Sequence, residues 1–182
     1  MGSCISCANE DIIVVNDNDN DNNNSDINIK RKAFFEHNRK REIHNSTKLK
    51  LSEDLCKKAK NKILKLIEKD DDEFIYDEDE EELGENLFIS YQGPVDAKTI
   101  CNSWYNEKNK YDFNKNKYQK GTGHFTQMIW KESKEVGFGW DTSKNNKFYF
   151  LAYYYPAGNE IGKFNQNVLV EKKSDGNSLL IQ

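Results

Sequence analysis

The sequence predicts a single α/β domain with a central, mostly antiparallel sheet between helices. Apolar residues recur at helical spacing from Leu51 to Ile67 and lysines cover the other side, which predicts an amphipathic helix. Residues 135–140 and 148–155 read as two strands joined by a polar turn. Because the second strand is apolar on both faces, we expect it to be covered on both sides. The 182 residues suffice for one such core with tails.

Three further stretches have helical character. Residues 29–43 form a basic segment whose Ala33, Phe34 and Phe35 are available to the core. The amphipathic helix described above has its own start signal, since Ser52 is suited to cap it and two acids follow in the first turn. Residues 94–108 are expected to form a helix that begins at a proline. The third stretch is short and lies within residues 121–130.

The decamer 121–130 is the stretch with the clearest chemical character. Gly121 and Gly123 permit a tight entry into a short helix, and His124 follows at once. The apolar rings of Phe125 and Trp130 would hold that histidine in place. Two interpretations stay open here: a core turn with a partly buried histidine, or a functional site.

The charge of the chain is distributed unevenly. Residues 30–69 hold 14 Lys and Arg against 5 Asp and Glu, whereas residues 68–82 hold 11 acids among 15 positions. The basic segment lacks interleaved aromatic residues on its lysine face, which argues against nucleic-acid binding. No apolar run approaches the roughly 18 residues that a membrane-spanning helix needs. The cysteines form no disulfide framework and fit a reducing compartment: Cys4, Cys7, Cys56 and Cys101.

The N-terminus fits the pattern for N-myristoylation. Gly2 becomes the first residue once Met1 is removed, and Ser6 is then the fifth residue, where the pattern requires Ser or Thr. Cys4 and Cys7 are candidates for palmitoylation, although an ordinary flexible N-terminus has to be weighed against both modifications. Residues 1–28 are therefore expected to form an acylated tail with an Asn- and Asp-rich, disordered spacer. Residues 174–182 are expected to form a loose tail.

Several motifs occur in an order that resembles one known family. They are Gly-Glu-Asn-Leu at 84–87, Trp-Tyr-Asn-Glu at 104–107, the decamer at 121–130 and Tyr-Tyr-Pro-Ala-Gly-Asn at 154–159. Together they resemble the CAP superfamily of cysteine-rich secretory proteins, antigen 5 and pathogenesis-related proteins, over residues 29–173. Ala152 stands where secreted members usually carry a cysteine, which argues against export. The C-terminal extension of the intracellular Golgi-associated pathogenesis-related subgroup is resembled by Phe164, Asn167, Val168 and Leu169. The resemblance implies an α-β-α sandwich.

In that family two histidines and two glutamates line a cleft. Glu85, Glu107 and His124 match three of these positions by motif. The first histidine has no counterpart, since residues 70–82 contain none, and the resemblance makes His37 and His44 structural. The residues expected to support the cleft are Trp104, Phe125, Trp130 and Asn86.

One imidazole with two carboxylates would hold zinc weakly. We therefore expect no tightly bound metal and no cofactor, with Glu85, Glu107 and His124 as weak divalent-metal candidates. The same residues would suit general acid–base chemistry, but no Ser or Cys is tied to His124 by a motif. The alternative is a buried hydrogen-bonded network that joins loop, strand and helix.

These observations favour a lipid-anchored, non-enzymatic protein on the cytosolic face of a membrane, either the Golgi and endomembranes or the plasma membrane. The acyl chains and the basic segment 30–69 would hold it there, although lysines on a helix are more often simply solvated. The resemblance suggests binding of a sterol, a fatty acid, a phosphoinositide or partner proteins. A metal-assisted hydrolase or peptidase and a self-associating, homodimeric scaffold remain alternatives, so the question of enzymatic activity stays open.

Overall fold

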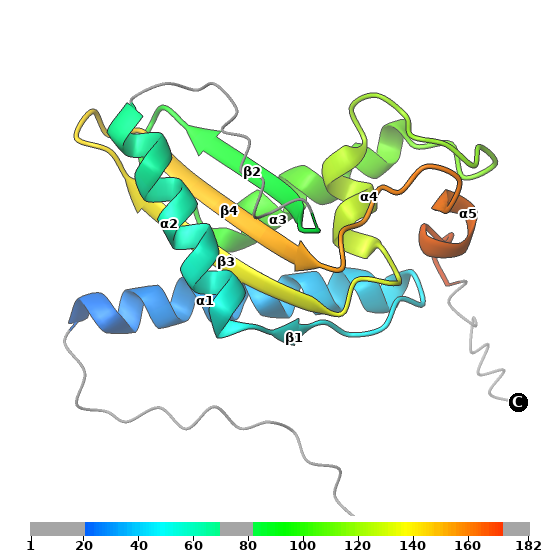
Figure 1. Ribbon diagram of the computed structural model, residues 1–182, viewed down its shortest axis with the longest axis horizontal. Coiled ribbons are helices and arrows are strands. Elements are labelled where there is room, and N and C mark those ends of the chain that lie inside the picture. The colour runs from blue at the N-terminus through cyan, green and yellow to red at the C-terminus, as the bar shows by residue number, and fades with distance from the viewer. Residues whose placement is uncertain (1–20, 70–81, 173–182) are drawn as a thin grey trace, which may run out of the picture.

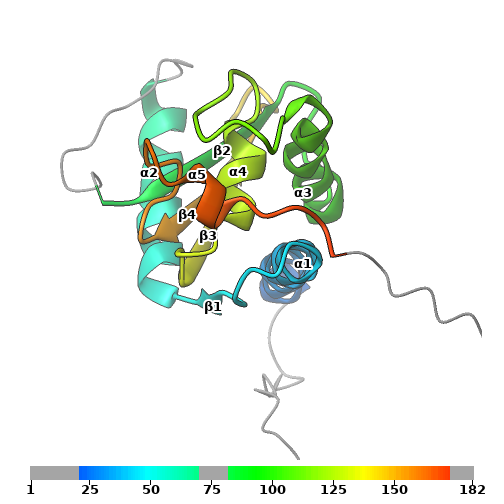
Figure 2. The same cartoon turned by 90° about the vertical axis from the view of Figure 1, so that its right-hand side faces the viewer.

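The computed structural model describes residues 21–69 and 82–172, with side chains from residue 28 onward. These residues form a three-layer α-β-α sandwich (Figure 1). Helix α2 (Glu53–Lys69) covers one face of the sheet. Figure 2 shows α1 (Asp21–Ile43), α3 (Ala97–Asn106) and α4 (Gly123–Ile129) on the other side. The prediction of one α/β domain with helices on both sides of its sheet is confirmed.

The sheet has four strands in the order β1-β3-β4-β2. They are β1 (Lys50–Leu51), β2 (Gly84–Ser90), β3 (Glu135–Thr142) and β4 (Phe148–Tyr155). Strand β4 pairs antiparallel with both β2 and β3, and the short β1 adds to β3 in parallel. The expected hairpin between β3 and β4 is present. Every β4 residue except Tyr155 is buried, so the prediction of a strand covered on both sides is confirmed.

Two glycines of β3 allow α2 to lie directly on the sheet. A Cβ at Gly137 would stand 2.3 Å from the backbone nitrogen of Cys56, and one at Gly139 would stand 2.4 Å from the carbonyl carbon of Ala59. Both distances are far below contact, so a larger residue at either position would push the helix away from the sheet. The alternation Gly-x-Gly in β3 therefore sets the spacing between these two layers.

The first helix departs from the sequence prediction in two ways. It begins at Asp21 rather than at residue 29, so the last part of the expected spacer is helical. Ala33 is fully buried, but Phe35 is 63% exposed. Residues 33, 36, 37, 40 and 41 form the buried side of the helix, and position 35 points away from it because of the helical period. The prediction that Phe35 joins the core is wrong.

The two helices that precede the decamer start close to where they were expected. The Ser52 Oγ lies 3.5 Å from the backbone nitrogen of Leu55, at the start of α2. Helix α3 begins at Ala97, and Asp96 caps it by accepting from the backbone N–H of Thr99 at 2.9 Å. A short 3-10 helix, η2 (Glu107–Lys110), continues α3, so Glu107 stands where one helix type gives way to the other.

Arg41 fixes the position of α4 relative to α1. Its guanidinium is fully buried and donates to the backbone carbonyls of Thr47, Met128, Trp130 and Ser133 at 2.8–3.0 Å. Two of these carbonyls lie at the C-terminal end of α4, where a helix leaves carbonyls unpaired. Burial lowers the pKa of Arg41 to about 10, yet the group stays charged near neutral pH. A positive charge at a helix C-terminus is favourable, which makes this residue a junction of the fold.

Candidate functional site

Glu107 and His124 are in direct contact. Glu107 Oε1 lies 2.7 Å from His124 Nδ1, while Oε2 accepts from the backbone N–H groups of His124 at 2.9 Å and Phe125 at 3.1 Å. These two N–H groups belong to the first turn of α4. The N–H groups of a first turn have no carbonyl acceptor within their own helix. One carboxylate therefore orients the imidazole and caps the helix that carries it. An ionised carboxylate only accepts, so Nδ1 carries the proton in the neutral ring.

Trp104 forms the wall behind this pair. Its ring is stacked on the imidazole of His124, with centroids 6.0 Å apart and planes 15° from parallel. Trp104 is buried, whereas the side chains of His124 and Glu107 are 40% and 20% exposed. No hydrogen bond from the described part of the chain reaches His124 Nε2. The imidazole is thus held on two sides and open to solvent on another.

Glu85 lies on the opposite face of strand β2. Its carboxylate pairs with Lys62 of α2 at 3.5 Å, and both side chains are largely buried. The next residue, Asn86, points the other way and donates to the His124 carbonyl at 3.0 Å. Neighbouring residues of a strand face opposite sides of the sheet, which explains the separation. The structure therefore brings together Glu107 and His124 and sets Glu85 apart from them, in contrast to the expected shared hollow of all three residues.

The four supporting residues lie where they can hold this arrangement. Phe125 and Trp130 are fully buried, and the Trp130 ring packs edge-on against Phe164 at 5.2 Å between centroids. Asn86 ties β2 to α4, and Trp104 supplies the stacking surface. Of these four residues, Trp104 is the one that contacts the His124 ring within residues 82–172. The other three hold the surrounding elements in place.

His37 and His44 lie outside the Glu107–His124 pair. His37 donates from Nδ1 to the Ala33 carbonyl at 2.7 Å and accepts from the Tyr154 hydroxyl at 2.8 Å through Nε2. Its burial lowers its pKa to about 4, so the ring is neutral at ordinary pH. His44 bonds the Leu169 carbonyl at 2.6 Å and the Tyr105 hydroxyl at 2.9 Å. Both histidines connect helices to the rest of the fold, as the resemblance implied.

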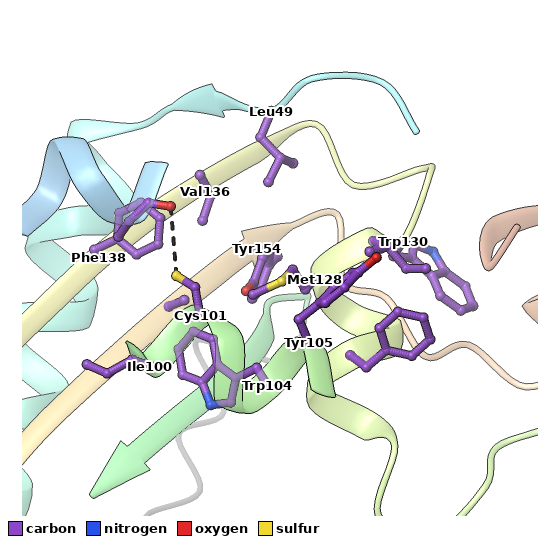
Figure 3. Packing of buried hydrophobic residues seen from close by; sticks show 14 of the residues in the cluster. Leu49, Ile100, Cys101, Trp104, Tyr105, Met128, Trp130, Val136, Phe138 and Tyr154 are labelled. Carbon is purple, nitrogen blue, oxygen red and sulfur yellow. Dashed lines mark hydrogen bonds between the residues drawn. The ribbon is translucent and has the colours of Figure 1, made fainter. Parts of the chain in front are cut away.

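The contact of Cys101 with a histidine was not predicted from the sequence. Its Sγ lies 3.5 Å from His37 Nδ1, and Figure 3 shows the thiol in the core with its bond to the Ala33 carbonyl. Burial raises the pKa of this thiol well above its usual range, and the neighbouring imidazole is neutral. A reactive cysteine needs the thiolate, so this pair is a packing contact and not a nucleophile with its base.

Gln127 is a second contributor that sequence reasoning missed. Its Oε1 accepts from the backbone N–H of Gly158 at 2.8 Å, and its Nε2 donates to Ser133 Oγ at 3.2 Å. A Cβ at Gly84 would come within 2.0 Å of the same amide oxygen, so a larger residue there would displace the Gln127 amide. The motifs at 84–87, 121–130 and 154–159 meet at this one side chain. Their glycines were the signal that a close approach occurs here.

These residues do not fit a zinc site. Among the residues that the structure describes, no group of three His, Cys, Asp or Glu side chains converges on one point. Both Glu107 oxygens already accept protein N–H groups, and the Glu85 carboxylate is paired with an ammonium group. Structural zinc takes four ligands and catalytic zinc takes three from the protein. The Glu107–His124 pair alone offers fewer.

The structure describes only some of the residues that are expected to contact a membrane. The acylation pattern at Gly2, Cys4 and Cys7 lies outside the described residues. Residues 30–69 divide between α1 and α2, which cover opposite faces of the sheet (Figure 2). In residues 21–69 and 82–172, no helix combines the length and the apolar character needed to cross a bilayer.

Comparison with known proteins gives a consistent result. The sequence profile of the family described as CAP, Cysteine-rich secretory protein family, matches residues 34–155. Golgi-associated plant pathogenesis-related protein 1 of Homo sapiens is 34% identical over 140 residues, which cover 75% of this chain and 90% of that protein. Protein PRY2 of Saccharomyces cerevisiae is 40% identical over 89 residues, which cover 47% of this chain and 25% of that protein.

Solved structures show the same fold. The structure of NaASP2 with Zn2+ superposes with a TM-score of 0.62 at 22% identity, covering 80% of this chain and 86% of that one. Venom allergen-like protein 4 of Schistosoma mansoni gives a TM-score of 0.58 at 21% identity, covering 80% of this chain and 95% of that one. The zinc in the first of these is a property of that protein, and at this identity the likeness establishes the α-β-α sandwich alone.

Proposed function

Since the chain belongs to the CAP family of cysteine-rich secretory proteins, we propose that it is a lipid-anchored, non-enzymatic CAP-domain protein on the cytosolic face of a membrane. The observation that carries the non-enzymatic part is the state of Glu107, whose two oxygens accept three N–H groups of the protein. A carboxylate used in this way has a structural role. It fixes a helix and a ring, and it has little capacity left for a substrate or a metal.

The surroundings of His124 support the same conclusion. A hydrolase of the nucleophilic type places a Ser or Cys within hydrogen-bond reach of its base. In the described residues the His124 side chain is hydrogen-bonded to Glu107 and stacked on Trp104, and no hydroxyl or thiol contacts it. Cys101, the thiol that does meet a histidine, is buried and protonated. These features favour a binding module over an acyl-transfer enzyme.

The N-terminal pattern supports anchoring. A single myristoyl chain gives only reversible membrane binding, with an association constant of roughly 10⁴ M⁻¹, so a second attachment is required. Cys4 and Cys7 offer sites for a second acyl chain next to Gly2. The Golgi-associated name of the human relative fits an endomembrane address for this chain, with the plasma membrane as the other possibility.

The ligand of the module stays a proposal at the level of chemical class. Lipids (sterol, fatty acid or phosphoinositide) and partner proteins are the candidates that the family relationship suggests. Self-association as a homodimer is a further candidate. A solvent-open imidazole backed by an indole ring, as His124 and Trp104 provide, is suited to a ligand with one polar end and one apolar end.

Removal of the acyl site tests the anchor. The full chain with Gly2→Ala, expressed in its own cell type, should move from the membrane fraction to the soluble fraction and should lose incorporation of labelled myristate. Asn9→Ala, outside the pattern, is the matched control and should stay on membranes. If the Gly2→Ala protein remains on membranes as the control does, the acyl anchor is not what holds the protein there.

A hydrolase is the second candidate, and one contact favours it. Glu107 orients the half-exposed His124 imidazole at 2.7 Å through Nδ1 and leaves Nε2 without a hydrogen bond from the described residues, which is the arrangement of a general base with its orienting carboxylate. What this pair lacks is a nucleophile or a metal-bound water. The zinc titration described in the Discussion separates this candidate from the binding module.

A further inference from the structure

We propose that the loops 111–122 and 156–163 together form a face that docks onto an anionic lipid bilayer. This inference rests on the proposed membrane location, and it does not depend on the acyl chains. It names the side of the domain that meets the membrane.

The first loop is held in a fixed shape by its own hydrogen bonds. The backbone N–H of Asp112 donates to the Gln119 side-chain oxygen at 2.9 Å, and the Gln119 amide donates back to the Asp112 carbonyl at 2.9 Å. Thr122 Oγ1 donates to the Gln119 carbonyl at 2.6 Å and closes the base of the loop. A compact surface loop with joined ends presents the side chains of its tip in a defined direction.

The second loop is attached to the first. Asn116 donates to the Gly162 carbonyl at 3.2 Å and accepts from the backbone N–H of Asn165 at 2.9 Å. The ring of Tyr118 lies 3.5 Å from the point that a Cβ on Gly123 would occupy. Figure 1 shows both loops at the same end of the molecule, and Figure 2 looks onto that end. The two loops therefore present one continuous surface beside the exposed His124.

This surface is basic. Residues 108–120 contain five lysines and one aspartate. Lys108 is paired with Glu171, and Lys115 is paired with Asp112 at 3.1 Å. The remaining lysines are exposed and form no ion pair with the described residues: Lys110, Lys117 and Lys120. In the second loop Lys163 and Glu160 neutralise each other at 2.8 Å. The unneutralised charge on this face is positive.

Two large apolar side chains stand among these lysines. Ile161 is 87% exposed and Tyr118 is 53% exposed, one on each loop. Ile161 precedes Gly162, whose φ of 86° turns the chain sharply at the tip. Apolar tips surrounded by lysines suit the boundary between headgroups and acyl chains, because the tips enter the apolar region while the ammonium groups stay with the phosphates. A soluble anion would engage the lysines but would leave these tips in water.

The other basic surfaces of the domain have acidic groups close to them. On α1 the exposed Phe35 has Arg31 and Lys32 beside it, but Lys30 is paired with Glu53 and Arg39 with Glu36. The lysines of α2 are followed directly by residues 68–82, with 11 acids among 15 positions. An anionic leaflet would repel that segment. The two loops combine two unpaired lysines, Lys117 and Lys120, with the most exposed apolar side chain of the described residues, Ile161. Lys110 borders the first loop and adds a further positive charge.

The acyl attachment and this face can reach the same bilayer. In Figure 1 helix α1 begins at the end of the domain opposite to the loops. Helix α1 has 23 residues and a length of about 35 Å. The 20 residues before Asp21 can span at most about 70 Å when fully extended. The chain length thus permits the acyl group and the loops to contact one membrane at the same time.

Vesicle binding of the unacylated full chain tests the face without the anchor. The protein is produced in a host that lacks the myristoyl transferase and is sedimented with phosphatidylcholine vesicles, with or without phosphatidylserine. We expect binding only when phosphatidylserine is present, and we expect it to weaken as salt increases. Lys117→Gln with Lys120→Gln should weaken binding about twenty-five-fold, at about fivefold per charge. Ile161→Ser should weaken it about tenfold.

Matched variants elsewhere keep the result interpretable. Lys57→Gln with Lys58→Gln removes two exposed lysines from α2, and Phe35→Ser removes an exposed apolar side chain from α1. Both should bind vesicles as the unchanged protein does, and all variants should share its melting temperature, because every altered side chain is exposed. Loss of binding in the control variants to the same extent would overturn the proposed face. So would competition by free inorganic phosphate at a concentration matched to the lipid phosphate, or no binding to phosphatidylserine at all.

The outcomes for the face and for the anchor are separate. If the protein is acylated and membrane-bound in cells but does not bind anionic vesicles when unacylated, the proposed function stands and the proposed face is wrong. If the protein binds anionic vesicles through the two loops but carries no acyl chain in cells, the proposed face stands and the acyl anchor is wrong.

Discussion

The Glu107 carboxylate holds the His124 imidazole and the first turn of α4 at the same time. One oxygen lies 2.7 Å from the ring nitrogen, and the other accepts two backbone N–H groups of the helix. The pair joins the end of α3 to the start of α4, so its energetic effect is on the packing of two helices. This relationship makes Glu107 a stabilising residue of the domain, and that role can be measured.

Glu107→Gln should destabilise the protein by about 2 kcal/mol. The amide keeps the shape, but it loses the charge that favours a helix N-terminus and replaces one accepting oxygen with a donor. The free energy of unfolding in urea measures the change. Glu132→Gln, at an exposed position, is the control and should alter stability by less than about 0.5 kcal/mol. Equal stability of Glu107→Gln and the unchanged protein would refute the capping role.

Zinc should bind weakly or not at all. The contacts that occupy Glu107 and pair Glu85 with Lys62 leave His124 Nε2 as the accessible nitrogen of this pair, and one such ligand does not hold zinc tightly. Isothermal titration of the full chain with zinc should show no micromolar binding. Micromolar or tighter binding that disappears in His124→Ala would establish a metal site and would favour the hydrolase over the binding module.

The sequence predicted the layers of the fold well because their signals are local. The apolar run of β4 and the helical spacing in α2 identify elements that are buried on two faces and on one face, respectively, and both are confirmed. Phe35 shows the limit of this reasoning. Three successive apolar residues in a helix cannot all face the core, and the sequence does not say which one points outward until the position of the helix is known.

The candidate site was predictable only in part for a related reason. Glu107 and His124 approach each other because the C-terminal end of α3 lies beside the N-terminal end of α4. The order of the motifs indicated both residues. Glu85 was assigned from the same motif as Asn86, but the alternation of a strand sends neighbouring side chains to opposite faces. Gln127 was missed because Gly84 and Gly158, which lie against it, are distant in sequence: glycines indicate a close approach but do not say which side chain approaches.

Arg41 is expected to be essential for stability. Arg41→Met removes a buried cation and takes one hydrogen-bond donor from each of four carbonyls, at a cost of about 3 kcal/mol or more. Urea unfolding gives the value, and Arg31→Met provides the control because Arg31 is exposed on the same helix. If the two variants unfold at the same urea concentration, the carbonyl contacts contribute nothing measurable to stability.

The burial of His37 predicts that acid destabilises the domain. Its pKa falls from 6.5 to about 4 in the folded protein because burial disfavours the charged ring. Between these two pKa values His37 is protonated in the unfolded chain and neutral in the folded protein. The free energy of unfolding therefore decreases as the pH falls through this window. The full difference corresponds to about 3 kcal/mol for this one group. The free energy of unfolding in urea, measured at several pH values from about 7 down to about 4, gives the slope.

A variant isolates the contribution of His37 from that of the carboxylates, which titrate in the same range. His37→Gln lacks a titrating group but keeps an amide that can bond the Tyr154 hydroxyl, so it should start less stable near neutral pH. Its stability should then fall less steeply with acid than that of the unchanged protein, and the two curves should converge as the pH approaches 4. Parallel curves over the whole range would mean that His37 takes up its proton as easily in the fold as in the unfolded chain. The network from Asn86 through Tyr154 to His37 would then have to accommodate a charged ring.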